Sequence, residues 1–364
     1  MKRHAIMAKC FKGILIMTVL LFVVSPCTMA EDAAVEPASE PLAEEANPSL
    51  APADKAASEM TALGAGGMAT MSGGEQPPLP SVSPSAIGGA FSSLMSESFK
   101  TDLATGAATM GIPIIVPPGR KNVQPNVALS YSSNNPNGLC GIGWSVPISA
   151  IQRSTKNGVP RYDNIDTFIA GGEELVNIGG NEYRAKIESS FTKYVYVNAD
   201  NKWIVYDKAG TQYHFGSIEA SRLCHPNKPA NIFAWYLDKA VDVYGNTITY
   251  TYEKSDNTIY PKYIDYTSNS SCNPQLLADK RVEFVYESAE RPDKIYSYRA
   301  GWPSVIKRRL EKIRISINGG VIWTYNLNYV VSPDTSRSLL TSIQLEDGSH
   351  NTLPAKTFTY QRLD

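Results

Sequence analysis

The sequence predicts an all-β fold made of multi-stranded antiparallel sheets, because its apolar residues recur with a period of two. In residues 247–252, Ile248, Tyr250 and Tyr252 share one face of an extended strand and three threonines share the other. The same alternation occurs in two further segments, residues 127–131 and 282–286. No stretch of the sequence carries a sustained helical period, so strands are expected to dominate.

A β-hairpin is predicted within residues 312–329. Apolar residues alternate in 313–317, reach Asn318-Gly319-Gly320, and alternate again in 321–329. An Asn-Gly pair supplies the positive φ angles that tight hairpin turns require. This segment is therefore the clearest pair of neighbouring antiparallel strands in the sequence.

Three prolines mark residues 112–118 as unsuited to the centre of a sheet. Pro113, Pro117 and Pro118 lack the N–H group that a central strand donates to its neighbours. We therefore expect this segment at a sheet edge, or as an extended crossover that lies over a sheet.

Residues 1–30 have the pattern of a secretory signal peptide. Basic residues precede an apolar run, residues 14–24, which is too short to span a bilayer as a mature helix. Ala30 completes a small-residue cleavage site, so the mature chain is expected to begin at Glu31 and to pass through the periplasm to the exterior. Lipoprotein processing at Cys27 and an uncleaved anchor are the alternatives. No later segment approaches membrane-spanning length.

Residues 31–87 are expected to form a disordered linker. Ala, Pro, Gly, Ser and Glu dominate this segment, which is acidic in its first half and contains no aromatic residue. Such a composition buries too little apolar surface to offset the entropy of ordering the chain. The β-rich module is therefore assigned to residues 88–364, which is long enough for a sizeable core.

The charge balance argues against a nucleic-acid partner. The formal net charge is −1, and the sequence carries no basic stripe of the kind that phosphate binding needs.

Two segments resemble each other at the level of turn and strand. Residues 203–216 and 241–250 each place an aspartate close to an aromatic residue, then a glycine-containing tight turn, then an alternating strand. They resemble the tyrosine-aspartate repeats of Rhs-type shell proteins. Two loose copies are equally compatible with ordinary hairpins.

No catalytic, cofactor or metal site is expected from the motifs. Residues 143–147 begin like a nucleophile elbow around Ser145, but Pro147 replaces the second glycine and no helix pattern follows. The glycine-rich residues 138–143 also lack the helix that a dinucleotide site requires. Trp144 is assigned to the core, where glycine neighbours such as Gly143 would let the backbone pass closely over the indole.

The mature histidines lie apart from one another and show no metal-ligand spacing with cysteines or carboxylates; they are His214, His225 and His350. Neighbouring acids along a strand point to opposite faces, so Glu173 and Glu174 are expected to be solvated. Asp163 and Asp166 are likewise expected at the surface.

The mature chain contains three cysteines, and export would allow a disulfide to persist. Cys224 and Cys272 both lie in loop-like sequence on either side of predicted strands, and we expect a bridge between them. Cys140 would then be a buried free thiol that behaves as a small hydrophobic residue. The alternative is three free thiols.

The order of several sequence blocks resembles the SpvB-type N-terminal module of bacterial virulence and insecticidal toxin-complex B proteins, which are related to Rhs proteins. The blocks are residues 106–120, 129–133, 138–145, 153–156, 158–162 and 166–175. The resemblance continues through residues 203–216, 235–252 and 336–343, and covers residues 88–364. The positions that match are Pro117, Pro118, Gly119, Arg120, Tyr131, Gly141, Gly143, Trp144, Arg153, Arg161, Tyr162, Gly171, Gly172 and Glu173.

The resemblance implies a framework role for these positions, with ion pairs from Arg153, Lys156 and Arg161 to Asp163, Asp166 or Glu173 at the surface. It also implies a secreted, virulence-associated, non-enzymatic scaffold or delivery module with a protein partner. Some relatives carry an ADP-ribosyltransferase domain marked by Glu-x-Glu after Ser-Thr-Ser, and this sequence has neither in usable order.

Other functions stay open. A glycan-binding or adhesion protein of the cell surface is favoured by the many tyrosines and tryptophans. A truncated remnant of a longer Rhs-type toxin is a further alternative, whereas a hydrolase rests on no motif.

Overall fold

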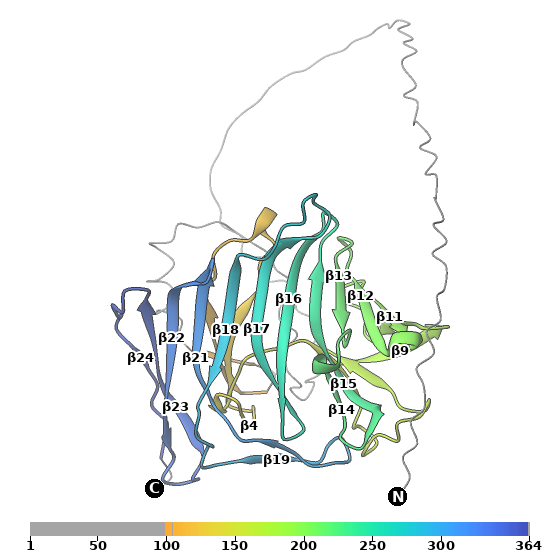
Figure 1. Ribbon diagram of the computed structural model, residues 1–364. Helices are drawn as coiled ribbons and strands as arrows, with labels where there is room; N and C mark the ends of the chain where they lie inside the picture. The colour runs from red at the N-terminus through yellow and green to blue at the C-terminus, as the bar shows by residue number, and fades with distance from the viewer. Residues whose placement is uncertain (1–98, 104, 363–364) are drawn as a thin grey trace, which may run out of the picture. The chain divides into compact units, whose positions relative to one another are not determined.

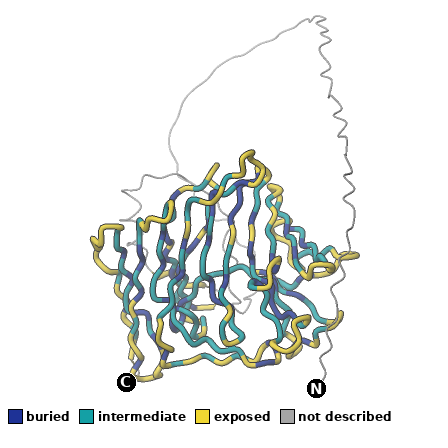
Figure 2. Tube along the Cα trace, in the orientation of Figure 1, coloured by how far each residue is buried: buried dark blue, intermediate teal, exposed yellow. Residues whose placement is uncertain are grey.

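The computed structural model describes residues 99–103 and 105–362, which lie within one compact unit, Ala65–Asp364. The expected signal peptide and linker, residues 1–30 and 31–87, lie outside the described residues. The described residues form strands β1 to β24 and three short 3-10 helices, which confirms the all-β prediction. Figure 2 shows that the buried residues lie along the strands, while the exposed ones concentrate in the connections.

The bounds of the elements are as follows. The strands of the smaller sheets are β1 (Lys100–Thr101), β2 (Ala108–Ile114), β3 (Val127–Ser132), β4 (Asn137–Gly138), β5 (Gly141–Ile142), β6 (Trp144–Ser145), β19 (Ile295–Ser297) and β20 (Ser304–Ile306). The first strands of the large sheet are β7 (Ala150–Arg153), β8 (Phe168–Ala170), β9 (Glu173–Gly179), β10 (Glu182–Ala185), β11 (Lys193–Val197), β12 (Lys202–Tyr206), β13 (Gln212–Phe215), β14 (Arg222–His225) and β15 (Lys228–Val241). Its remaining strands are β16 (Asn246–Ser255), β17 (Thr258–Asn269), β18 (Lys280–Tyr286), β21 (Leu310–Ile317), β22 (Gly320–Val331), β23 (Ser338–Asp347) and β24 (Lys356–Thr357). The 3-10 helices are η1 (Arg120–Asn122), η2 (Asn198–Asp200) and η3 (Glu219–Ser221).

Part of the large sheet closes into a barrel. Its strands run in the order β13-β12-β11-β10-β9-β8-β7-β15, and β13 also pairs with β15, so the ring is complete. The closing pairs run from Gln212 with Val241 to Phe215 with Leu237. Closure removes the free strand edges that an open sheet would expose. Figure 1 shows most of these strands in green, beside the longer strands that follow β15.

The barrel interior is an aromatic core. Its buried residues are Ile151, Phe168, Ala170, Leu175, Tyr194, Trp203, Val205, Phe215, Ile232, Trp235 and Leu237. Trp203 and Trp235 are both fully buried, and their ring centroids lie 6.2 Å apart. Alternate residues of each strand point inward, so every second position is apolar, as the period of two predicts.

Beyond β15, the large sheet continues as an open sheet in the order β16-β17-β18-β21-β22-β23-β24. A four-stranded sheet, β1-β2-β3-β6, packs against it and is called the small sheet below. Apolar residues of both sheets share one core, to which β2 and β3 contribute Ile112 and Leu129, and β18 and β21 contribute Val282 and Ile313. The described residues therefore form two large cores, one inside the barrel and one between two sheets.

Two local predictions are confirmed. The hairpin of β21 and β22 turns at Asn318 and Gly319, whose φ angles are 49° and 81°. Pro113 pairs with Ala128 of β3, but β1 reaches only as far as Thr109, so Pro113 has a strand neighbour on one side. The segment containing Pro113 also packs over the open sheet, through Ile112 and Ile114.

Residues 287–309, here called the crossing segment, connect β18 to β21 and contain β19 and β20. In Figure 1 this segment runs along the lower ends of the strands toward the barrel. Trp302 of the crossing segment packs with Phe233 and Ala234 of β15 in a third, small core. The crossing segment therefore links the open sheet to the end of the barrel.

Candidate functional site

Trp144 anchors the small sheet to the C-terminal part of the chain. Its side chain is buried, as the sequence analysis expected, between the rings of Tyr131 and Phe358 at centroid distances of 5.2 and 4.8 Å. Its indole Nε1–H donates to the Tyr360 hydroxyl at 3.0 Å, and that hydroxyl donates to the Leu340 carbonyl at 2.8 Å. Residues separated by more than two hundred positions thus share one contact.

Gly143 is required by the ring of Tyr131, and not by the indole of Trp144 as expected. Its φ angle is +78°, and a Cβ atom at this position would lie 2.4 Å from a Tyr131 ring carbon. A side chain would therefore clash with the ring and strain the backbone as well. The glycine shapes the contact of Trp144 indirectly, because Tyr131 packs on Trp144.

Arg153, the last residue of β7, forms a largely buried ion pair. Its guanidinium is 2.9 Å from Asp166, and the two side chains are only 11% and 8% exposed. Its Nε–H donates to the Ile232 carbonyl at 2.9 Å, and the ring of Phe168 lies 5.3 Å away. The expected pairing with Asp166 is present, but its expected place at the surface is wrong.

Backbone groups of the same loop also satisfy the carboxylate of Asp166. Asp166 also accepts the backbone N–H groups of Arg161 and Tyr162, at 2.9 and 2.7 Å, so its carboxylate organises the loop between β7 and β8. These charge-assisted hydrogen bonds replace the contacts with water that burial removes from the carboxylate. The exposed pairs of the same loop join Arg161 to Asp163 at 3.3 Å and Lys156 to Glu174 at 3.8 Å.

The predicted disulfide between Cys224 and Cys272 is wrong. All three described cysteines are free thiols. Cys224 lies opposite Ile232, whereas Cys272 follows Asn269, which pairs with Asn246 beyond the other end of β15. About nine residues of extended strand separate those two ends, or about 30 Å, while a disulfide needs Cα atoms within about 7 Å.

Cys140 is fully buried, as expected, and burial raises the pKa of its thiol to about 12. A thiol with such a pKa stays protonated and does not act as a nucleophile at neutral pH. Its role is therefore to fill space in the core between the two sheets.

Sequence reasoning missed a buried network centred on Arg291. This side chain is fully buried and donates to Asp293 at 2.9 and 3.0 Å, to the Asn137 side chain at 2.9 Å and to the Gly138 carbonyl at 2.7 Å. Asp293 also accepts from the backbone N–H and the hydroxyl of Ser338, both at 2.6 Å. The network therefore ties the crossing segment to β4 and to the start of β23.

Electrostatics hold this network in its charged form. Burial by itself raises the pKa of Asp293, but hydrogen bonds from Arg291, Ser338 and Asn137 outweigh it, and the pKa lies well below its ordinary value. No sequence signal points to the network, because the three segments that form it are 45 or more positions apart and none of its residues belongs to a periodic pattern.

The two tyrosine-aspartate-like segments share one turn geometry. Asp207 and Asp242 each accept a hydrogen bond from the backbone N–H two residues on and another from the N–H four residues on, at 2.8 to 2.9 Å. Asp347 makes the same two bonds at 2.8 Å, so the described chain contains a third copy that sequence comparison missed. His350 occupies the positive-φ position that Gly210 fills in the first copy, and this replacement hides the repeat.

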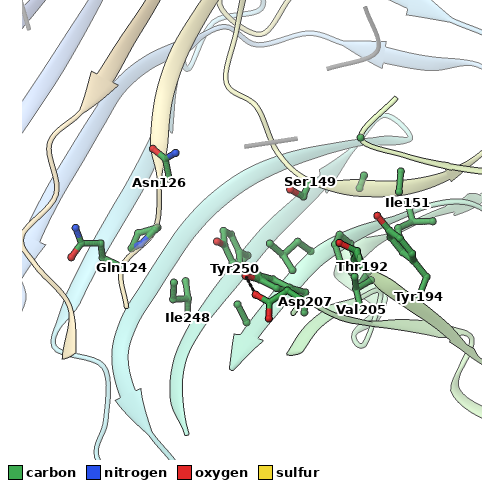
Figure 3. A pocket seen from close by; sticks show the side chains of 18 residues that line it. Gln124, Asn126, Ser149, Ile151, Thr192, Tyr194, Val205, Asp207, Ile248 and Tyr250 are labelled. Carbon is green, nitrogen blue, oxygen red and sulfur yellow. Dashed lines mark hydrogen bonds between the residues drawn. The ribbon is translucent and has the colours of Figure 1, made fainter. Parts of the chain in front are cut away.

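A pocket of about 70 Å³ opens at one mouth of the barrel, where the turns after β8 and β12 meet β16 (Figure 3). Its apolar lining includes Ile151, Val205 and Ile248. Its polar lining includes Asp207, Thr192, Tyr194, Tyr213, Tyr250, Gln124, Asn126 and Ser149. We call this site the barrel-mouth pocket.

The described residues bring no catalytic groups together around Ser145. Its hydroxyl donates to the Ser130 carbonyl at 3.5 Å, and no histidine of residues 99–362 has a recorded contact with it. The same residues contain no group of three or more His, Cys, Asp or Glu side chains placed to hold a metal ion. Across the described residues, no helix has the length and apolar character needed to cross a membrane.

The described strands define a β-rich module that contains a closed barrel and an open sheet. A family model described as "Salmonella virulence plasmid 65kDa B protein" matches residues 102–297, which is more than half of the chain. The chain therefore belongs to the SpvB family.

Two similar proteins are both mono(ADP-ribosyl)transferases SpvB. The protein of Salmonella choleraesuis is 26% identical over 231 residues, and that of Salmonella enteritidis is 27% identical over 231 residues. Each match covers 55% of this chain and only 38% of the relative.

Solved structures share the fold. A crystal structure of TcdB2-TccC3 has a TM-score of 0.64 at 21% identity and covers 72% of this chain and 16% of that one. The N-terminal domain of the effector SpvB from Salmonella typhimurium has a TM-score of 0.57 at 22% identity and covers 65% of this chain and 98% of that domain. The Tc holotoxin pore of Photorhabdus luminescens has a TM-score of 0.60 at 20% identity and covers 68% and 15%.

Proposed function

We propose that this chain is an exported, non-enzymatic scaffold that holds a protein partner. The observation that carries the proposal is the shared fold with the TcdB2-TccC3 and Tc holotoxin structures, in which this kind of module is part of a larger assembly. The buried networks around Arg291 and Arg153 support it, because they fix loops far apart in sequence into one rigid framework.

Export is the second part of the proposal. Residues 1–30 would direct the chain out of the cytoplasm, and residues 31–87 would tether the module formed by residues 88–364. The secreted or extracellular destination suits a virulence-associated family.

The absence of catalysis is tested against the activity named for the relatives. The purified full chain is incubated with adenylate-labelled NAD⁺ and a host-cell lysate. We expect no more protein labelling than a heat-inactivated sample gives. Labelling that native protein produces and heating abolishes would contradict the non-enzymatic part of the proposal.

The scaffold role is tested by cross-linking the chain in the exported fraction of its own producer, followed by mass spectrometry. Cross-links from surface lysines of residues 99–362 to one recurrent protein are expected. If cross-links join only residues of this chain to each other, the scaffold role fails.

Glycan binding is the second candidate, and one observation favours it. Tyr296 of β19 and Tyr298, which directly follows this strand, are 60% and 63% exposed, so the crossing segment presents two aromatic rings to solvent two positions apart. A glycan array with the wild-type chain and with a Tyr296→Ala/Tyr298→Ala double variant tests it. Binding that the double variant loses would support a carbohydrate ligand.

A further inference from the structure

The described lining of the barrel-mouth pocket contains a single charged side chain, which is negative. Asp207 is the one charged side chain among the described residues that line it. Its Oδ1 atom is occupied by the backbone N–H groups of Ala209 and Thr211. Its Oδ2 atom accepts from the Tyr213 hydroxyl at 3.3 Å, which is long for an O–H donor. This oxygen therefore has capacity for a stronger, charged donor.

The pocket also presents hydroxyl groups that lack partners. Tyr194 is 6% exposed, and its hydroxyl makes no hydrogen bond to any other described residue. The hydroxyl of Tyr250 is likewise without a partner in the described part of the chain. The fully buried side-chain polar atoms without a partner in the described part of the chain are the indole nitrogens of Trp203 and Trp302, so both tyrosine hydroxyls are accessible from the pocket. Figure 3 shows Tyr194, Tyr250 and Asp207 around the same pocket.

Burial raises the pKa of Tyr194 to about 12 and that of Tyr250 further above its ordinary value. Both phenols are therefore neutral at physiological pH and keep their oxygen lone pairs available as acceptors. Phe215 and Tyr213 add ring surfaces to the lining, and aromatic faces attract cations.

We propose that the barrel-mouth pocket binds an alkylammonium group, with Asp207 as its counter-ion and the tyrosines as acceptors and ring walls. The proposal follows from the chemistry of the described lining residues. They supply one carboxylate, several oxygen acceptors and aromatic rings, and none of them is basic. A neutral ligand would leave the carboxylate uncompensated, and an anion would be repelled by it.

The size of the pocket agrees with this ligand. Its 70 Å³ is several times the roughly 10–15 Å³ that one water molecule needs, so it accepts a short amine but not a large cofactor. An ammonium group of this size comes either from a free amine or from the end of a lysine side chain on a bound segment.

The test uses the full chain and saturation-transfer NMR titrations with propylammonium chloride, with 1-propanol as the neutral comparison. Nα-acetyl-lysine amide, titrated in parallel, separates a lysine side chain from a free amine. We expect saturable propylammonium binding and at least tenfold weaker binding of propanol.

Matched variants separate the charge from the turn. Asp207→Asn should weaken propylammonium binding at least tenfold. Asp242→Asn changes the equivalent turn outside the pocket lining and should leave binding unchanged, with a similar shift in melting temperature. Tyr250→Phe removes one hydroxyl while keeping the ring and should weaken binding severalfold, which keeps the test usable if Asp207→Asn fails to fold.

The proposal is overturned if the wild type shows no saturable binding of either amine, or if propanol binds as tightly as propylammonium. It is also overturned if Asp207→Asn binds like Asp242→Asn, or, where Asp207→Asn does not fold, if Tyr250→Phe binds like the wild type. Binding of the lysine amide identifies a partner's side chain as the source, and binding of propylammonium alone identifies a free amine.

Discussion

The buried network of the crossing segment gives the sharpest stability prediction. Asp293→Asn keeps the size of the side chain but removes the charge that Arg291 faces, leaving a fully buried guanidinium without a counter-ion. It also turns an amide donor toward the donors of Ser338 and Arg291. Breaking a buried pair by removing one partner costs about 3–5 kcal/mol of the free energy of unfolding.

A surface pair in the same protein provides the control. Arg281 and Asp265 lie 2.6 Å apart, but their side chains are 46% and 23% exposed. Asp265→Asn should therefore cost only about 0–1 kcal/mol. Urea unfolding followed by tryptophan fluorescence measures both variants against the wild type. Equal losses for Asp293→Asn and Asp265→Asn would refute the argument that burial makes the Arg291 network strong.

The pH dependence of the same group has a definite sign. The pKa of Asp293 is lowered in the folded protein, so its contribution to stability is complete above the unfolded value of about 3.9 and is lost as the pH falls through the folded value. The wild type should lose stability on acidification below about pH 4 more steeply than Asp293→Asn does. Parallel losses for the two proteins would show that Asp293 is not held charged by its neighbours.

Four further outcomes are expected. Trp144→Ala should lower the free energy of unfolding by about 3–5 kcal/mol, the range for truncating a buried large aromatic side chain, whereas Ser145→Ala should have little effect in the same urea titration. Cys140 should react with iodoacetamide only after denaturation, and rapid labelling of the native protein would contradict its burial. N-terminal sequencing of exported protein should begin at Glu31; intact Met1 would exclude cleavage. Limited proteolysis should remove residues 31–87 first and leave a strand-rich core by circular dichroism, and early cleavage within β15 to β18 would count against this organisation.

Local sequence patterns predicted the strands well, since the side-chain period of two is visible in each strand by itself. The Asn318-Gly319 turn and the edge position of Pro113 were also predicted correctly, because both depend on local backbone chemistry. Closure of the barrel could not be predicted from the sequence, because the pairing of β13 with β15 depends on the bend and register of a long strand.

The errors at individual residues arose where a feature depends on the assembled fold and not on local sequence. The Cys224–Cys272 bridge was inferred from loop-like sequence, but the distance between the two ends of β15 is a property of the assembled sheet. Arg153 looked like a surface residue because its burial depends on rings contributed by Phe168, Tyr162 and Trp235. The Arg291 network and the barrel-mouth pocket are assembled from distant segments, so no local pattern indicates them.

The central claim, that the chain is a scaffold that works by holding a protein partner, is tested most directly by sedimentation of the native protein from the exported fraction of its producer. We expect the wild-type chain to sediment in an assembly much larger than itself. The Asp293→Asn variant, in which the crossing segment is loosened, should leave that assembly at temperatures where its barrel remains folded. A wild-type chain that sediments alone, at the mass of a single copy, would contradict the account.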